Sequence, residues 1–156
     1  MLSEKEVATR LRDTIIRKSN NYIQTSEVIE EVDNNKRGYS IIHVNIPIQG
    51  YPDCGMTLYV VDGQISIMSY PVSENIGNKK YESLDLCNVV NESRDFYTLF
   101  YSTRDDSIRI KTSFFYSLNT DAYGNKIFMN SDFVDLQVYE TIISIGRVWC
   151  TIIDNS

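Results

Sequence analysis

The sequence predicts an α+β fold in which an antiparallel sheet of about five strands is flanked by helices, in the order α-β-β-β-α-β-β-α. Two observations support this prediction. Apolar residues recur at helical spacing near both ends of the chain, and between them β-branched and aromatic residues form short runs separated by turns. With 156 residues the chain has a usual size for one domain, so we expect residues 1–156 to form a single domain.

The first helix is predicted at residues 4–18. Ser3 and Glu6 have the spacing of a capping box, and apolar residues then follow at intervals of four. These residues are Val7, Leu11 and Ile15. The next stretch, residues 22–33, is compatible with a short strand or a helical turn, and its apolar residues favour the strand.

Strand character begins at residue 39, where β-branched residues lead into a turn-rich loop that includes residues 50–55. Two short apolar runs, residues 58–61 and 65–68, then flank Asp62-Gly63. This dipeptide tolerates the positive φ of a two-residue turn, so the pattern predicts a β-hairpin.

A second helix is predicted at residues 81–91, and a second hairpin follows it. Residues 98–102 and 108–113 alternate between apolar and polar side chains on either side of a turn at residues 104–106. One face of this hairpin is therefore expected to meet the core and the other to meet water. Residues 119–130 are expected to form a loop around a glycine.

The final helix, predicted from residue 131 onward, has an unusually wide apolar face. Asp132 and Asp135 lie in its first turn, where the helix dipole favours acidic residues. Two apolar stripes run side by side along it. The first contains Val134, Val138, Ile142, Ile145, Trp149 and Ile152, and the second contains Leu136, Tyr139, Ile143, Cys150 and Ile153. Because residues 141–153 are rich in β-branched residues, a strand for part of them stays open.

A helix with such a wide apolar face must be covered on more than one side. Either the sheet of the same chain wraps around it, or a second chain covers the remainder. In the second case, the candidate protein-interaction surface consists of five residues of the first stripe, namely Val138, Ile142, Ile145, Trp149 and Ile152.

Composition and charge disfavour several classes of function and of cellular location. The formal net charge is -6 and the sequence pI is about 4.7, which disfavours binding to nucleic acid or to an anionic membrane. Cys54, Cys87 and Cys150 are odd in number and far apart, as expected of reduced thiols. The charged N-terminus lacks the apolar core of a signal peptide, and no run approaches the roughly 20 apolar residues of a membrane span. We therefore expect a cytoplasmic location.

No motif in the sequence predicts catalysis, a cofactor or a metal site. His43, the single histidine, lies in a predicted strand without ligand residues at a suitable spacing. Residues 119–124 are similar to the start of a calcium loop, but Tyr123 occupies the fifth position, and Asn130 occupies the twelfth, where the site needs a bidentate Glu. Phosphate-loop, dinucleotide-binding and nucleophile-elbow motifs are missing. We therefore expect a protein that is not an enzyme.

The order of the predicted elements resembles that of the bacterial YbjN-like domain family, whose fold is similar to that of type III secretion chaperones. Residues 84–91, with the sequence LDLCNVVN, look like the mid-chain helix of that family with its spaced asparagines. The likeness covers most of the chain from Ile23 onward, whereas residues 45–55 and 119–130 depart from it. The resemblance implies a non-enzymatic sensory or regulatory domain, whose relatives in fold dimerise and bind polypeptides.

The sequence thus favours a non-catalytic protein-binding or regulatory module, chaperone-like or sensory, with an unidentified protein partner or a second copy of itself. The eleven tyrosines agree with this reading, since tyrosine is common at protein interfaces. One alternative is an acidic immunity-type inhibitor of a toxin, which would gather Glu30, Glu31, Asp105 and Asp106 on one face. A second is an enzyme with an unrecognised site, which would show a deep pocket with shifted pKa values.

Overall fold

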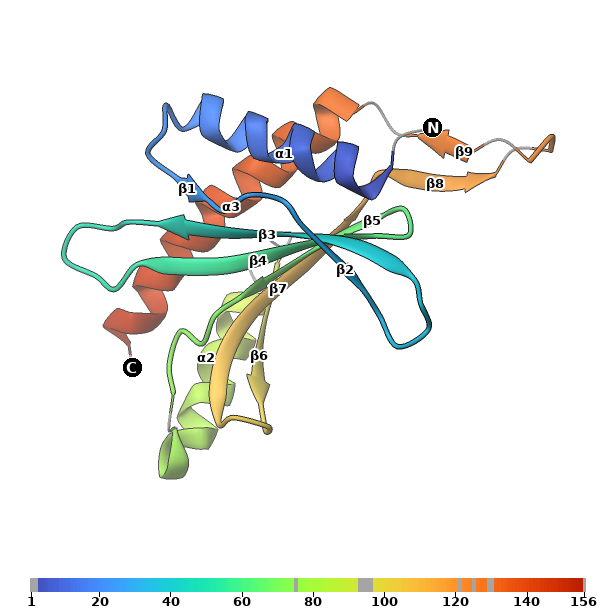
Figure 1. Cartoon of the computed structure of the whole chain (residues 1–156). Coiled ribbons are helices and arrows are strands. Elements are labelled where there is room, and N and C mark those ends of the chain that lie inside the picture. Colours follow the sequence, from blue (N-terminus) through green and yellow to red (C-terminus); the bar gives the residue numbers. More distant parts are fainter. Residues whose placement is uncertain are drawn as a thin grey trace.

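In the computed structural model of the protein, the described residues are 3–74, 76–92, 97–120, 122–124, 126–128 and 131–155. They form three α-helices, one short 3-10 helix and nine strands (Figure 1). The helical elements are α1 (Glu4–Lys18), η1 (Gly77–Lys79), α2 (Lys80–Asn91) and α3 (Ser131–Asp154). The strands are β1 (Gln24–Thr25), β2 (Ile29–Val32), β3 (Gly38–Ile46), β4 (Cys54–Val61), β5 (Gln64–Ser69), β6 (Thr98–Ser102), β7 (Ser107–Phe115), β8 (Ser117–Thr120) and β9 (Lys126–Phe128).

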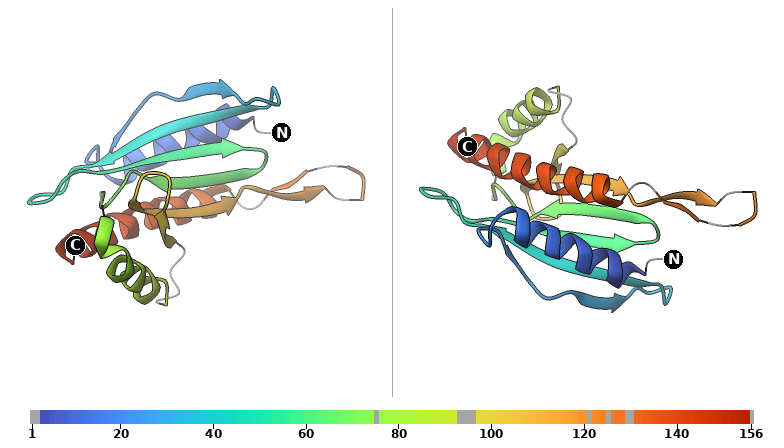
Figure 2. Two further views of the ribbon diagram at one scale, coloured as in Figure 1. Left: turned by 90° about the horizontal axis from the view of Figure 1, so that it is seen from below. Right: turned by 90° about the horizontal axis from the view of Figure 1, so that it is seen from above.

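Seven of the strands form one antiparallel sheet in the order β1-β3-β4-β5-β7-β6, and β2 pairs with β3 beside β1. The helices α1 and α3 lie side by side against one face of this sheet (Figure 2). The helix α2 packs against β6, near the C-terminal end of α3. Among the described residues, no helix lies over the other face of strands β3 to β5 (Figure 2, left). We call this side of the sheet, which the register continues from Tyr59 through Ser66 to Ser113 on β7, the uncovered face.

The core lies between the sheet and the pair α1 and α3. The strand register places Ile42 opposite Leu58, and Leu58 opposite Ile67, and each of these side chains is at most 1% exposed. The helix α1 adds the predicted stripe of Val7, Leu11 and Ile15, which are all buried. The predicted capping box is confirmed, because the Glu6 N–H donates to Ser3 Oγ and the Ser3 N–H donates to Glu6 Oε2.

The candidate interaction stripe of α3 is part of this core. Val138, Ile142, Ile145, Trp149 and Ile152 are each at most 4% exposed in the single chain. They are covered because α3 packs against both the sheet and α1, so two sides of the helix are enclosed at once. The expectation that these residues offer a surface to a second chain is therefore corrected, and the intramolecular alternative holds.

Further cover comes from the loop between β3 and β4. Trp149 Nε1 donates a hydrogen bond to the Pro52 carbonyl at 3.1 Å, and the Tyr51 hydroxyl donates to the carboxylate of Asp154 at 2.9 Å. The second stripe of α3 is half-buried. The alternative of a strand within residues 141–153 is wrong, since α3 continues to Asp154.

The antiparallel α+β architecture is confirmed, but the strand count and the element order differ from the prediction. The ambiguous residues 22–33 supply β1 and β2, both paired with β3, so the favoured short strand is found there. The predicted loop of residues 119–130 overlaps β8 and contains β9, and these two strands form a separate two-stranded sheet. The loop prediction is wrong at these strands because the turn residues around Gly124, which has a φ of 82°, connect a hairpin.

The edge strand β6 is capped by a side chain. Asn91, the last residue of α2, donates from Nδ2 to the Leu99 carbonyl at 3.0 Å and accepts from the Leu99 N–H at 2.8 Å. Both backbone groups of Leu99 are thus bonded outside the ladder with β7. The amide of Asn91 occupies the place of a further strand, which protects a sheet edge from pairing with another chain.

Replacing Trp149 tests the position of α3. Trp149→Ala is expected to lower the free energy of unfolding by about 3–5 kcal/mol, because the change leaves a cavity in the core and removes the bond to Pro52. Trp149→Phe should lower the free energy of unfolding by less, because the phenyl ring fills part of the cavity. Urea titrations followed by circular dichroism measure both. Glu140→Ala, an exposed change in the same helix, is the control, and a Trp149→Ala chain as stable as that control would contradict the packing.

Replacing Asn91 tests the cap of β6. Asn91→Ala removes two hydrogen bonds and is expected to cost about 1–2 kcal/mol of stability. It also exposes the edge of β6, so self-association should increase, as light scattering over a concentration series would show. Asn88→Ala, an exposed change in the same helix, should leave both properties nearly unchanged. Equal behaviour of the two variants would refute the cap.

Candidate functional site

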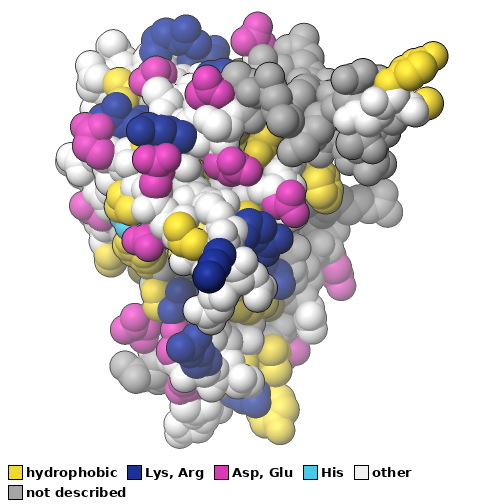
Figure 3. Space-filling view, turned by 45° about the vertical axis from the view of Figure 1, so that its right-hand side comes forward, with side chains coloured by type: hydrophobic (Ala, Val, Ile, Leu, Met, Phe, Trp, Pro, Cys, Tyr) yellow, Lys and Arg dark blue, Asp and Glu magenta, His cyan; other side chains and the backbone are white. Residues whose placement is uncertain are grey.

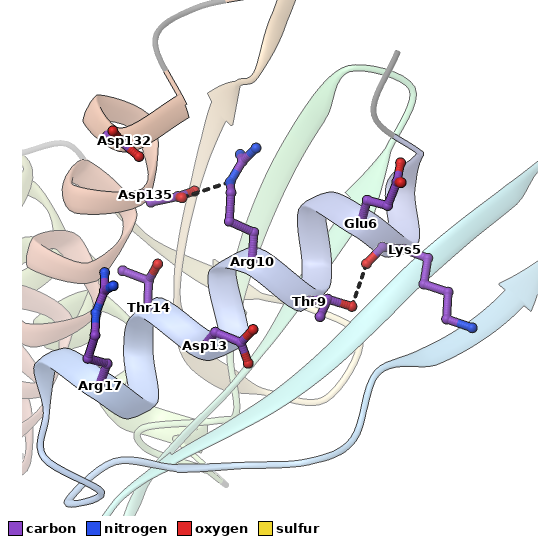
Figure 4. A pocket seen from close by; sticks show the side chains of 9 residues that line it. All are labelled: Lys5, Glu6, Thr9, Arg10, Asp13, Thr14, Arg17, Asp132 and Asp135. Carbon is purple, nitrogen blue, oxygen red and sulfur yellow. Dashed lines mark hydrogen bonds and ion pairs between the residues drawn. The ribbon is translucent and has the colours of Figure 1, made fainter.

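A groove of about 690 Å³ lies between α1 and the N-terminal part of α3 (Figure 4). We call it the helix groove. It is lined by Lys5, Glu6, Thr9, Arg10, Asp13, Thr14, Arg17, Asp132 and Asp135. The α1 residues reach it because positions three, four and seven apart fall on one side of a helix. Ionisable side chains of both signs therefore face one another across two helices.

The central contact of the helix groove is an ion pair between the two helices. Arg10 Nε donates to Asp135 Oδ2 at 2.7 Å. The side chain of Asp135 is 5% exposed and that of Arg10 is 25% exposed. The second carboxylate oxygen, Asp135 Oδ1, is buried and has no hydrogen-bond partner among the described residues. The carboxylate is thus satisfied at only one of its two oxygens.

Burial raises the pKa of Asp135, because water no longer solvates the charged carboxylate. The hydrogen bond and the charge of Arg10 lower this pKa and offset only part of the rise, although the pair is short. Asp132 adds a smaller increase through repulsion. The ionised form of Asp135 consequently depends on Arg10.

Two further side chains of α1 point across the helix groove. Arg17 is exposed and extends toward α3, and Thr14, with 6% exposure, directs its hydroxyl toward the same helix (Figure 4). Among the described residues, Arg17 forms no ion pair with a carboxylate. Lys5 instead extends away and pairs with Glu30 at 3.3 Å.

The uncovered face of the sheet is the second candidate site. The register brings Tyr59 beside Ser66, and Ser66 beside Ser113, at its centre. A depression of about 710 Å³ lies here, and Lys111 Nζ sits 4.9 Å from the centre of the Phe100 ring. Tyr59 is 36% exposed and Phe115 is 54% exposed. This face therefore combines aromatic and polar groups at the surface.

His43 lies on the same face and is held by neighbouring hydroxyl groups. Its Nδ1 is 3.2 Å from Thr57 Oγ1 and 3.2 Å from the Tyr70 hydroxyl. The Tyr70 ring packs over Gly55, where a Cβ atom would come within 2.5 Å of the ring, so the sequence needs glycine here. His43 is exposed and lies in β3, so its predicted position in a strand is confirmed.

The predicted acidic clusters lie at opposite edges of the sheet. Glu30 and Glu31 are on β2, beside β3, whereas Asp105 and Asp106 are in the turn between β6 and β7. In the view of Figure 3, acidic and basic side chains are interspersed. The acids named for the inhibitor alternative therefore do not converge.

Asp105 and Asp106 are both engaged in local bonds. Hydrogen bonds from Ser107 and then Arg109 hold the pKa of Asp105 well below its usual range. Bonds from the Tyr101 hydroxyl and the Gly77 N–H lower the pKa of Asp106, and the Gly77 bond measures 2.8 Å. These two carboxylates thus stabilise the turn and the start of η1.

The three cysteines are free thiols that lie apart from both sites. Cys54 and Cys87 are buried, and burial raises the pKa of Cys54 to about 12. Among the described residues no group of three or more His, Cys, Asp or Glu side chains could hold a metal ion. The calcium-like segment falls partly outside the described residues. Within the described part, no helix has the length and apolar character needed to cross a membrane.

No protein-family model, curated protein or solved structure matches this chain. The likeness to the YbjN-like family therefore stays a prediction from the sequence.

Sequence reasoning identified the acids at the start of α3 but missed their partner Arg10. Arg10 and Asp135 are 125 residues apart in the sequence, so no local sequence pattern could predict that they form a pair. The available signal was indirect: Arg10 and Thr14 border the apolar stripe of α1, where a neighbouring helix could contact them.

Replacing Arg10 tests the ion pair and its dependence on pH. Arg10→Gln leaves the buried Asp135 carboxylate without a countercharge, so we expect a loss of about 1–3 kcal/mol at neutral pH. Because the pKa of Asp135 is raised in the folded chain, the fold favours its protonated form, and stability falls as pH rises through that pKa. The loss in Arg10→Gln should therefore shrink at acidic pH.

Urea titrations at several pH values, with exposed Lys18→Gln as the control, measure this effect. The double change Arg10→Gln with Asp135→Asn should recover part of the loss, because the uncompensated charge is then removed. A penalty that does not vary with pH would contradict the assigned role of Asp135.

Proposed function

We propose that this protein is a non-catalytic protein-binding domain of a regulatory or chaperone-like kind, and that it binds a partner polypeptide across the uncovered face of its sheet. The observation that carries the proposal is the composition of that face. Tyr59 and Phe115 are substantially exposed there, and Met68 and Phe100 are half-buried beside them. Aromatic and methionine side chains that remain in contact with water on a folded chain are enriched at protein interfaces.

The polar groups on the same face favour a protein as the ligand. Ser66, Ser113 and Lys111 stand between the aromatic residues, so the face offers hydrogen bonds as well as apolar contact. Interfaces that form and separate have this mixed character, whereas a core does not. Because Asn91 caps the edge at Leu99, the partner is expected to lie across the face and not to extend the sheet beside that residue.

The order of the elements supports the same proposal. The full order differs from the prediction, but when β1, β2, β8, β9 and η1 are left aside the remaining elements run α-β-β-β-α-β-β-α, the order on which the resemblance to the YbjN-like family and type III secretion chaperones is based. A second copy of this chain is one partner that the proposal includes. A cytoplasmic location also belongs to it, since Cys54, Cys87 and Cys150 are unpaired. The net charge of -6 favours a protein partner over a nucleic acid.

The two alternatives have less support. The inhibitor alternative needs acids gathered on one face, and the named acids lie at opposite edges of the sheet. The enzyme alternative needs a deep pocket lined by several polar groups with shifted pKa values that are available for chemistry. Glu6 and Asp135 have pKa values shifted in opposite directions, but Glu6 caps α1 and Asp135 pairs with Arg10.

Site-specific photo-crosslinking tests the proposed surface. A benzoylphenylalanine residue at Phe115 or at Tyr59 is expected to yield a discrete adduct in cells of the source organism, because both positions are exposed on the uncovered face. The same residue at Lys18, which is exposed on α1, is the matched control. Gel mobility and mass spectrometry identify the adduct as a second copy of the chain or another protein.

A charge on the face should abolish the adduct without unfolding the chain. Phe115→Asp is expected to change stability by about 0.5 kcal/mol or less, as exposed substitutions usually do, and to remove the adduct formed from position 59. An equal adduct from Lys18, or no adduct from either position on the face, would refute the proposed surface.

A further inference from the structure

The helix groove contains a buried acceptor that lacks a donor. Asp135 is 4% exposed, and its Oδ1 atom has no hydrogen-bond partner among the described residues. Leaving a buried carboxylate oxygen unpaired is costly, because the oxygen has lost water without gaining a protein donor. A cationic N–H group is the donor that would satisfy a carboxylate best.

Further donor groups line the helix groove together with Asp135. Arg10 reaches Asp135 through Nε, so its terminal guanidinium nitrogens are not engaged in that bond. Arg17 follows Arg10 by seven residues, on the same side of α1, and its side chain extends toward α3 (Figure 4). Thr14 lies between the two arginines and directs its hydroxyl to α3. These groups suit a planar anion such as a carboxylate.

The distribution of charge selects the class of ligand. Three basic and four acidic side chains line the helix groove, so neither sign dominates it. A phosphate with two negative charges would meet repulsion from Asp13, Asp132 and Asp135. A ligand that carries one positive and one negative group can be complementary to both sets at once. The volume of about 690 Å³ is in the usual range for small-molecule sites.

We infer that the helix groove binds a small zwitterion of the α-amino acid class, whose ammonium group pairs with the carboxylate of Asp135 and whose carboxylate accepts from Arg17 and the terminal nitrogens of Arg10. The ligand spans α1 and α3 and thereby joins the two helices that cover the sheet. This site does not include the uncovered face, so the inference can be tested independently of the proposed protein-binding surface.

The experiment is an NMR titration of the full-length, 15N-labelled chain with each standard L-amino acid in turn. At least one amino acid is expected to shift backbone resonances of α1 near Thr14 and of α3 near Asp135, in a saturable manner. The two analogues of that amino acid that lack the amino group or the carboxylate should each bind at least about tenfold more weakly, because each loses one charge-assisted contact.

Two variants test where in the helix groove the ligand binds. Arg17→Gln, an exposed change outside the ion pair, is expected to weaken binding about tenfold, whereas its neighbour Lys18→Gln, which does not line the groove, should bind as the unmodified chain does. Asp135→Asn should likewise weaken binding, and urea titration verifies that this variant folds.

Several results would overturn the inference. One is the absence of saturable shifts at the helix groove with every amino acid. Another is an analogue without the amino group that binds as tightly as its parent, since the contact to Asp135 would then be irrelevant. Unchanged affinity in Arg17→Gln would exclude the proposed contact with the carboxylate, whether or not Asp135→Asn folds.

Discussion

The burial of α3 between the sheet and α1 is the constraint on which the rest of the structure depends. A helix with two apolar stripes cannot satisfy both against one flat surface, so it needs a second element beside it. The helix α1 and the loop at Pro52 provide this cover, and Trp149 is enclosed as a result. This arrangement leaves the opposite face of β3 to β5 uncovered, because α1 and α3 occupy the same side (Figure 2).

The contact between α1 and α3 includes a polar pair within an otherwise apolar interface. Arg10 and Asp135 contribute little net stability compared with apolar packing, since removing the carboxylate from water costs more than the pairing with Arg10 returns. The pair does, however, link α1 directly to α3 through a short hydrogen bond. The same pair leaves one oxygen of Asp135 unsatisfied, which makes this seam chemically distinct from the rest of the helix surface.

The two long edges of the sheet are protected in different ways. Asn91 satisfies the outward-facing backbone groups of Leu99, and at the other edge β2 presents exposed acidic side chains at Glu30 and Glu31. Charge and side-chain caps both discourage pairing with further strands. Access for a partner is thereby directed to the uncovered face, where aromatic side chains remain exposed, and away from these edges.

Local sequence determined those features that depend on neighbouring residues. The capping box of Ser3 and Glu6 and the turn at Asp62-Gly63 arise from short-range hydrogen bonds and backbone preferences, so they were predictable, as was the α+β class. The hairpin of β8 and β9 was missed because its turn chemistry alone is also compatible with a loop.

The tertiary structure alone decided what each apolar or polar face contacts. Periodicity shows that a stripe of α3 is apolar, but whether the same chain or a second one covers it depends on the packing of α1, which lies more than a hundred positions away. Other contacts also depend on tertiary packing. They include the pair of Arg10 with Asp135, the pair of Asn91 with Leu99, and the pairing of both β1 and β2 with β3. Such contacts depend on topology and register, which residue spacing within a single segment does not encode.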